Sequence, residues 1–154
     1  MSAEFARAPT AIHALVAAAR AHDARVIARL PSGWAMFGAR QFVRGYALLL
    51  PDPVVPDVNS LDIQQRMQFL LDMSLVGDAL LEVTGALRIN YAIFGNLEPA
   101  LHAHIVPRYA DEPPALRTQH PWAYDWDAAE IFDPRACEDL ALAVRRELAR
   151  ISAR

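Results

Sequence analysis

Residues 100–109 read ALHAHIVPRY and carry two histidines, His102 and His104, on a short apolar run. Side chains two apart on a β-strand leave from the same face, so the two imidazoles lie side by side if this run is extended. The apolar residues between and after them then point to the opposite face, toward a core. A matched pair of buried polar rings is harder to satisfy by accident than a lone one, which makes this pair the first candidate for a functional site.

The segments around this run predict an antiparallel sheet covered by a long helix. Asn59 or Ser60 opens a long segment that ends at Gly85, and from Phe69 to Val83 its apolar residues repeat at spacings of four and three, which is typical of a buried helix stripe. A GNLEP turn at 95–99 then returns the chain into the histidine run, so the histidines belong to the second strand of a hairpin. Short apolar runs bounded by turn residues indicate the remaining strands, at 26–30, 34–37, 46–50 and 87–94.

Amphipathic spacing predicts a further helix near each end of the chain. One covers about 11–21, and the other covers about 133–152 with Asp133 as its N-cap. No repeat or composition shift divides the sequence. We therefore expect one α+β domain over 1–154, with its core at about 26–109 and a C-terminal helical extension.

Charge and composition narrow the function. The 154 residues carry a net charge of −3, which gives no electrostatic reason to grip a nucleic-acid backbone. All 15 basic residues are arginines, so a Walker-type phosphate loop and a Schiff-base lysine are excluded. Any bound phosphate must be held by backbone N–H groups, arginine, histidine or amides.

Cysteine content and the N-terminal segment bear on the compartment. Cys137 is the single cysteine, so an intramolecular disulfide and a cysteine-rich metal site are excluded, and its place in a helical pattern predicts a core residue. Residues 1–25 have an early acid and interspersed arginines, unlike a signal peptide or a membrane span. The sequence thus predicts a cytoplasmic protein with no membrane partner.

Polar groups gather at the start of the predicted hairpin. Asn90, Gly95 and Asn96 can supply side-chain amides and backbone N–H groups close to the histidines, as an oxyanion or phosphoryl group requires. Arg108 is the nearest guanidinium. Strand alternation puts it on the histidine face but beyond the site, which gives it a supporting role.

The stretch from Gly95-Asn96 through a short spacer to LHAHIVPR at 101–108 resembles the signature of the histidine triad (HIT) nucleotide hydrolases and transferases, His-φ-His-φ-His-φ-φ. Upstream, a glycine followed by an apolar strand that ends in proline at 45–51, then a loop, a long helix and a hairpin, is similar to the order of that family's core. The resemblance covers about 26–109. It implies a HIT-like fold, with a mostly antiparallel sheet, a long helix on one face and a C-terminal helix.

Position by position, the resemblance implies that His102 is the nucleophile that takes a nucleoside monophosphate from its leaving group. It implies that His104 helps to bind the phosphoryl group and that Asn90, Gly95 and Asn96 lie around the phosphates and the departing group. The implied activity is diadenosine polyphosphate hydrolase-like, in a homodimer without a resident cofactor. A divalent cation accompanying the substrate phosphates is left open.

Two positions depart from the family pattern. Ala100 stands where the first histidine of the triad is expected, and near Gly38 the asparagine or acid that relatives present to the ribose is missing. Ala100 would share the cleft-facing side of the strand with the histidines, so we expect an open position that tolerates a larger side chain.

Three interpretations of the histidine pair remain open. The first is an active hydrolase, and the second is a catalytically silent nucleotide-binding protein, which the alanine at position 100 motivates. The third is a zinc site, because His-x-His on a strand suits zinc, with His120, His13 or His22 as a further ligand.

Aromatic residues outside the motif are predicted to be structural. For Trp122, Tyr124 and Trp126 we favour packing of their loop against the sheet or a dimer partner over stacking on a nucleotide base. Trp34 and Tyr46 are predicted to be core residues.

Overall fold

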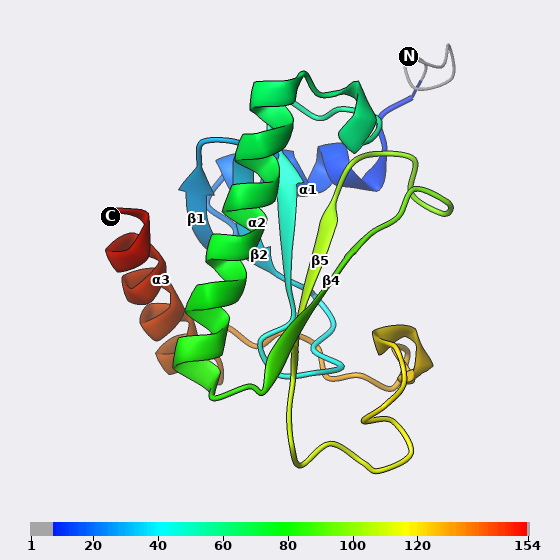
Figure 1. The fold of residues 1–154 in the computed structure, drawn as a ribbon, viewed down its shortest axis with the longest axis vertical. Coiled ribbons are helices and arrows are strands. Elements are labelled where there is room, and N and C mark those ends of the chain that lie inside the picture. Colours follow the sequence, from blue (N-terminus) through cyan, green and yellow to red (C-terminus); the bar gives the residue numbers. More distant parts are fainter. Residues whose placement is uncertain (1–7, 154) are drawn as a thin grey trace.

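A five-stranded antiparallel sheet forms the centre of the molecule in the computed structural model, which describes residues 8–153 (Figure 1). Its strand order is β1-β2-β3-β5-β4. The strands are β1 (Val26–Leu30), β2 (Gly33–Phe37), β3 (Ala47–Pro51), β4 (Arg88–Ile93) and β5 (Ala103–Arg108). The helices are α1 (Ala11–Arg20), α2 (Ile63–Thr84) and α3 (Glu138–Ser152), with short 3-10 helices η1 (Val58–Ser60) and η2 (Pro121–Ala123).

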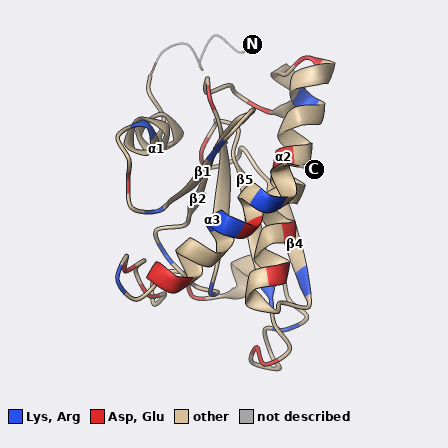
Figure 2. Cartoon of the chain, turned by 90° about the vertical axis from the view of Figure 1, so that its left-hand side faces the viewer, with Lys and Arg blue, Asp and Glu red and all other residues tan. Residues whose placement is uncertain are grey.

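The helices form layers on both faces of the sheet. The long helix α2 and the C-terminal helix α3 cover one face, and α1 lies on the other side of the strands (Figure 2). This arrangement confirms the predicted α+β class, the mostly antiparallel sheet and the long helix on one face. Charged residues of both signs are interspersed along α2 and α3 in the same view. No helix within residues 8–153 is both long and apolar enough to cross a membrane.

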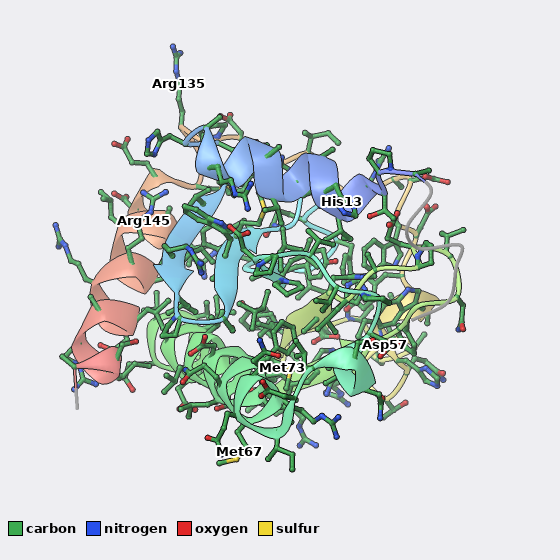
Figure 3. All side chains as sticks on the ribbon, turned by 90° about the horizontal axis from the view of Figure 1, so that it is seen from above. His13, Asp57, Met67, Met73, Arg135 and Arg145 are labelled. Atoms are coloured by element: carbon green, nitrogen blue, oxygen red, sulfur yellow. The ribbon has the colours of Figure 1, made fainter. Side chains whose placement is uncertain are left out.

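The main core lies between the sheet and α2. Seen from above, Met73 lies on the side of α2 toward the sheet and packs against this core, whereas Met67 points away and is 59% exposed (Figure 3). The largest core side chains come from α2, from β2, β3 and β5, and from α3: Phe37, Leu49, Phe69, Leu80, Ile105 and Leu148.

The long helix begins two or three residues later than predicted from Asn59 or Ser60 as its opening residue. Asp62 is the N-cap, since its carboxylate accepts from the Gln65 N–H at 2.8 Å while the Gln65 side-chain oxygen accepts from the Asp62 N–H at 3.1 Å. The residues before it form η1 instead. Gly85 ends the helix in the left-handed conformation (φ 69°), as predicted.

The last helix also begins later than predicted. The Arg135 N–H donates to the Asp133 carboxylate at 2.9 Å, and residues 134–137 form a turn rather than the first helical residues. Cys137 therefore precedes α3 as its N-cap and is half-buried, packed against the core rather than fully inside it.

Candidate active site

The two histidines lie on the face of the sheet opposite α2. His104 of β5 pairs with Leu48 of β3 on one side and Ala92 of β4 on the other. Leu101 and Ile105 point to the other face, into the core under α2, as alternation predicts. His102, however, lies one residue before β5, because the Leu101 N–H donates to the Val55 carbonyl at 2.8 Å, outside the sheet.

His102 is held in one orientation by its own chain. Its Nδ1 lies 2.8 Å from the carbonyl oxygen of Ala100, and the side chain is only 8% exposed. Since a carbonyl oxygen can only accept, Nδ1 must carry the proton, and Nε2 of the neutral ring keeps its lone pair. The backbone carbonyl of residue 100 thus fixes the tautomer of His102 and leaves Nε2 without a proton.

His104 is an uncharged neighbour of His102. The two rings lie 4.9 Å apart at 71°. Burial, and then repulsion from His102 when His102 is protonated, lower the pKa of His104 from 6.5 to about 4. At neutral pH His104 is therefore uncharged and can donate one hydrogen bond.

Tyr46 contacts His104 and was missed by the sequence interpretation, which predicted only a core residue. Its hydroxyl lies 2.7 Å from His104 Nδ1, although its side chain is buried as predicted. Burial raises the pKa of the Tyr46 hydroxyl, so it keeps its proton and can donate to Nδ1. His104 Nε2–H then remains as the donor toward a ligand.

The same tyrosine explains the glycine at position 38. A Cβ built on Gly38 would lie 2.2 Å from the Tyr46 ring, so no side chain fits there while the ring stays in place. The Gln41 amide donates to the Gly38 and Tyr46 carbonyls at 2.8 and 2.9 Å, and its oxygen accepts from the Gly45 N–H at 3.0 Å. The departure near Gly38 is thus coupled to the position of His104.

The expectation that Ala100 lies on an open face is wrong. Ala100 is fully buried in a cluster formed with Ile12 and Val16 of α1 and with Met36 and Leu50 of the sheet. Strand alternation correctly predicted that Ala100 lies on the histidine face of the sheet, but α1 covers this part of that face. An apolar cluster therefore occupies the place of the first triad histidine.

Aromatic side chains enclose His104 on the remaining side. The ring of Trp122 meets the His104 ring edge-on, with 5.0 Å between the ring centroids. The centroids of the Phe94 and Trp126 rings lie 6.3 and 6.5 Å from that of His104. Trp122 and Trp126 also stack on each other at 5.7 Å. The favoured prediction of loop packing is confirmed, and this packing lies against the candidate site itself.

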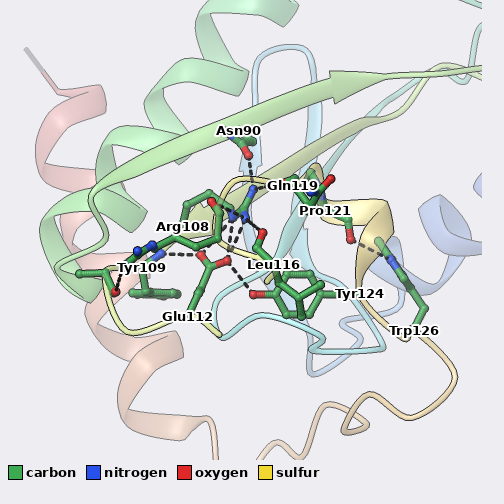
Figure 4. A network of polar contacts seen from close by, with 11 residues as sticks. Asn90, Arg108, Tyr109, Glu112, Leu116, Gln119, Pro121, Tyr124 and Trp126 are labelled. Atoms are coloured by element: carbon green, nitrogen blue, oxygen red, sulfur yellow. Dashed lines mark hydrogen bonds and ion pairs between the residues drawn. The ribbon is translucent and has the colours of Figure 1, made fainter. Parts of the chain in front are cut away.

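A buried arginine holds the loop that carries Trp122 and Trp126 (Figure 4). Arg108 is 6% exposed and donates to both Glu112 carboxylate oxygens at 2.8–3.1 Å, to Asn90 Oδ1 at 2.7 Å and to the Gln119 carbonyl at 2.9 Å. The Tyr124 hydroxyl also donates to Glu112, at 2.6 Å. Burial alone would raise the pKa of Glu112, but these hydrogen bonds keep it below its ordinary value. Arg108 thus lies beyond the histidines, as predicted, and its hydrogen bonds go to Asn90, Glu112 and the loop after β5.

The predicted phosphate-binding residues fall in two places. Asn90 lies on the histidine face opposite Val106 and binds Arg108, two residues along β4 from the partner of His104. Gly95 and Asn96 line a different hollow of about 720 Å³, formed with residues 8–11 and 56–57. No hydrogen bond among the described residues joins Gly95 or Asn96 to either histidine.

The histidines considered as further metal ligands lie apart from the pair. His13 caps α1 by accepting from the Thr10 N–H at 3.0 Å, His22 follows the end of α1, and His120 is exposed just before η2. Within residues 8–153 no group of three or more His, Cys, Asp or Glu side chains is placed to hold a metal ion.

Comparisons with solved structures give one consistent result. No protein-family model matches the sequence, and no curated protein does. A histidine triad protein of Bradyrhizobium japonicum has 26% identity and a TM-score of 0.70, covering 84% of this chain and 94% of its own. A zinc-bound histidine triad family protein of Mycobacterium smegmatis has 18% identity and a TM-score of 0.67, covering 91% and 95%. The diadenosine triphosphate hydrolase of Plasmodium falciparum has 15% identity and a TM-score of 0.62, covering 83% and 78%.

Proposed function

Because the chain is a HIT-like protein with the fold of the histidine triad proteins, we propose that it binds nucleotides and hydrolyses nucleoside phosphate derivatives through His102. The observation that carries this proposal is the 2.8 Å hydrogen bond from His102 Nδ1 to the carbonyl of residue 100. It leaves the Nε2 lone pair available beside a neutral His104 that can donate. The diadenosine triphosphate hydrolase among the structural neighbours supports a substrate of this class.

In the proposed reaction the lone pair of His102 Nε2 attacks phosphorus, and a nitrogen–phosphorus bond forms. The bond from phosphorus to the leaving oxygen or nitrogen breaks, and its electron pair goes to the leaving group, which takes a proton from solvent. Water then attacks phosphorus, the electron pair of the nitrogen–phosphorus bond returns to Nε2, and the water proton goes to solvent. His104 Nε2–H donates to a phosphoryl oxygen in both steps.

The test compares wild type with His102→Ala and His102→Asn on a panel of dinucleoside polyphosphates and nucleoside phosphoramidates. Wild type is expected to turn over at least one substrate and to form a nucleotidyl adduct on the peptide that contains His102, detected by mass spectrometry after acid-free quenching. Both variants are expected to lose turnover while retaining the wild-type melting temperature within a few degrees. Undiminished hydrolysis by His102→Ala would refute the proposal.

A catalytically silent nucleotide-binding protein is the second candidate. The observation that favours it is the enclosure of the site: His102 is 8% exposed, α1 fills the position of the first triad histidine, and Trp122 stands 5.0 Å from His104. Nucleotide binding by titration calorimetry, with no turnover of any panel member, would establish this function instead.

We also propose that no resident cofactor is needed, since the nucleophile and a phosphoryl donor both come from the chain. A divalent cation could still accompany the phosphates of the substrate. Elemental analysis of protein purified without added metal tests this point. Stoichiometric zinc would favour the zinc interpretation, and a zinc-bound histidine triad family protein is among the structural neighbours.

The remaining proposal is a homodimer through α2 and β4. Met67, Leu70 and Leu71 are 59%, 40% and 51% exposed on one side of α2. The ring of Tyr91 from β4 reaches Gly77 of α2, since a Cβ built on Gly77 would lie 2.0 Å from the Tyr91 hydroxyl. The exposed apolar patch on α2 therefore continues onto the sheet.

Among residues 8–153, β4 is an edge strand whose single partner is β5, so one side of its backbone is available to a second copy. Light scattering after size exclusion is expected to give a dimer mass. Leu71→Asp is expected to yield monomers, whereas Leu142→Asp on α3, a side chain of similar exposure, is expected to leave the mass unchanged. A monomeric wild type would refute this assembly.

A further inference from the structure

The histidine pair is covered from two sides in this structure. His102 is 8% exposed, so little of its ring is accessible to a ligand as large as a nucleotide. The sheet carries the two histidines from below. Above it, α1 covers one side, and residues 120–125 cross the other side, where the Trp122 ring meets His104 edge-on. One of these two coverings has to move before a ligand reaches both imidazoles.

Helix α1 is firmly held in its place. Its inward side chains Ile12 and Val16 are 3% and 2% exposed in the cluster around Ala100. Near its C-terminal end, Arg20 forms an ion pair with Asp52. Moving α1 would break this ion pair and expose the apolar cluster to water, so α1 is a fixed wall of the site.

The segment 120–125 runs between two fixed points. Just before it, the buried Arg108 donates to the Gln119 carbonyl at 2.9 Å. Just after it, Arg40 donates to the Asp127 carbonyl at 3.0 Å. The two ends of the segment are therefore anchored by arginine side chains from different parts of the sheet face.

Between these anchors the segment is attached by side chains alone. In the part of the chain that the structure describes, no backbone–backbone hydrogen bond links residues 120–125 to any other residue. The Trp122 ring packs on His104 but is 41% exposed. The Tyr124 hydroxyl ties the segment to Glu112 at 2.6 Å (Figure 4). The segment can therefore swing outward without breaking the backbone hydrogen bonds of the sheet or of the anchored loop.

We propose that residues 120–125 form a lid over the histidine pair, which Trp122 closes and the hydrogen bond from Tyr124 to Glu112 latches. The lid opens while its two anchors stay in place, and a ligand binds the open form. Its purpose rests on the proposed function, since it controls access to the two histidines, but its movement requires no turnover. Because the closed form does not bind, the apparent affinity for a ligand is reduced by the fraction of protein that is open.

Chemical modification of the free protein measures this movement. Diethyl pyrocarbonate modifies accessible imidazoles, and peptide mass spectrometry gives the rate at each histidine. In wild type, His102 and His104 are expected to react far more slowly than the exposed His22. Tyr124→Phe removes the latch and is expected to speed both reactions about tenfold relative to His22, the effect of losing one hydrogen bond to a carboxylate. Equal rates in Tyr124→Phe and wild type would overturn the lid.

A matched variant and a further histidine separate lid opening from loss of the fold. Tyr109→Phe also removes a hydrogen bond of a tyrosine hydroxyl, to the Arg44 carbonyl at 2.7 Å, but it lies outside the lid and is expected to keep the wild-type rates. Loss of the fold would also speed the reaction of His13, which caps α1. A rise confined to the histidine pair therefore reports the lid. Light scattering checks that each variant keeps the wild-type mass.

Turnover gives a second readout and keeps the lid separate from the proposed function. If wild type hydrolyses a substrate through His102, the kcat/KM of Tyr124→Phe is expected to rise with the modification rate, because more of the protein is open. Turnover that requires His102, together with equal modification rates in Tyr124→Phe and wild type, would keep the function and overturn the lid. If wild type turns over no substrate, the proposed function fails and the modification rates alone decide the lid.

Discussion

The burial of Ala100 leads to a prediction opposite to the one that the motif alone suggests. Restoring the triad by Ala100→His would place an imidazole in a cluster where Ala100 is 0% exposed and Ile12 and Val16 of α1 are 3% and 2% exposed. Overpacking a filled core costs about 1–3 kcal/mol. A buried polar ring without a partner adds about 1–3 kcal/mol. The free energy of unfolding is therefore expected to fall by about 2–6 kcal/mol.

For a domain of this size, such a loss lowers the melting temperature by about 5–20 °C. Differential scanning calorimetry and urea denaturation measure it directly. Ala14→His puts the same ring on the exposed side of α1 and serves as the control, with an expected change within about 0.5 kcal/mol.

A second substitution tests whether α1 is the cause. Val16→Ala removes two methyl groups that face position 100, so it is expected to destabilise the wild type but to cost less, or to stabilise, in the Ala100→His background. A melting temperature of Ala100→His equal to that of the wild type would refute the packing argument. The catalytic rate is expected to fall with the variant, since the carbonyl of residue 100 holds His102.

The pKa of His104 is lowered from 6.5 to about 4 in the folded state, so between these pH values the unfolded chain binds a proton more readily than the folded chain. The free energy of unfolding is therefore expected to fall by roughly 2–3 kcal/mol as the pH decreases from 6.5 to about 4, and to fall less in His104→Asn. Identical pH profiles of the wild type and His104→Asn would contradict the burial argument. Gly38→Ala is expected to displace the Tyr46 ring, whose nearest atom would lie 2.2 Å from the new Cβ, and to cost about 1–3 kcal/mol in urea denaturation. Its His104 NMR titration is expected to match that of Tyr46→Phe, and a wild-type titration would count against the coupling. Arg108→Ala leaves the buried Glu112 carboxylate without its partner and is expected to lower the free energy of unfolding by about 3–5 kcal/mol. The double variant Arg108→Ala/Glu112→Ala is expected to recover part of this loss. Equal stabilities of the single and double variants would show that the pair is not coupled.

Much of the sheet and the histidine pair could be predicted because their signals are local. Alternation over residues 101–106 depends only on the two-residue period of a strand, and it placed His104 on one face and Ile105 in the core beneath α2. The apolar stripe and Gly85 likewise predicted the long helix and its end. The start of the long helix was predicted too early because Asp62, and not Asn59 or Ser60, caps its first turn.

Contacts between distant segments were beyond the reach of these patterns. The bond between Tyr46 and His104 joins residues 58 apart and depends on the register of β3 against β5, which no single strand specifies. Arg108 donates hydrogen bonds to Asn90 of β4 and to Glu112 of the loop after β5. An arginine followed four residues later by a glutamate, Arg108 and Glu112, is a sequence signal that could have suggested an ion pair, but not its burial or its position behind the site.

The sequence by itself determined the α+β class, the strand and helix order, and the placing of two imidazoles on one face, because side-chain direction within one element follows from its period. Only the tertiary structure decided that Ala100 is covered, that Gly38 makes room for Tyr46, and that the aromatic loop encloses His104. Each of these depends on which element packs over which part of the sheet. That choice is made by the summed burial of many side chains across the whole chain, so no short stretch of sequence records it.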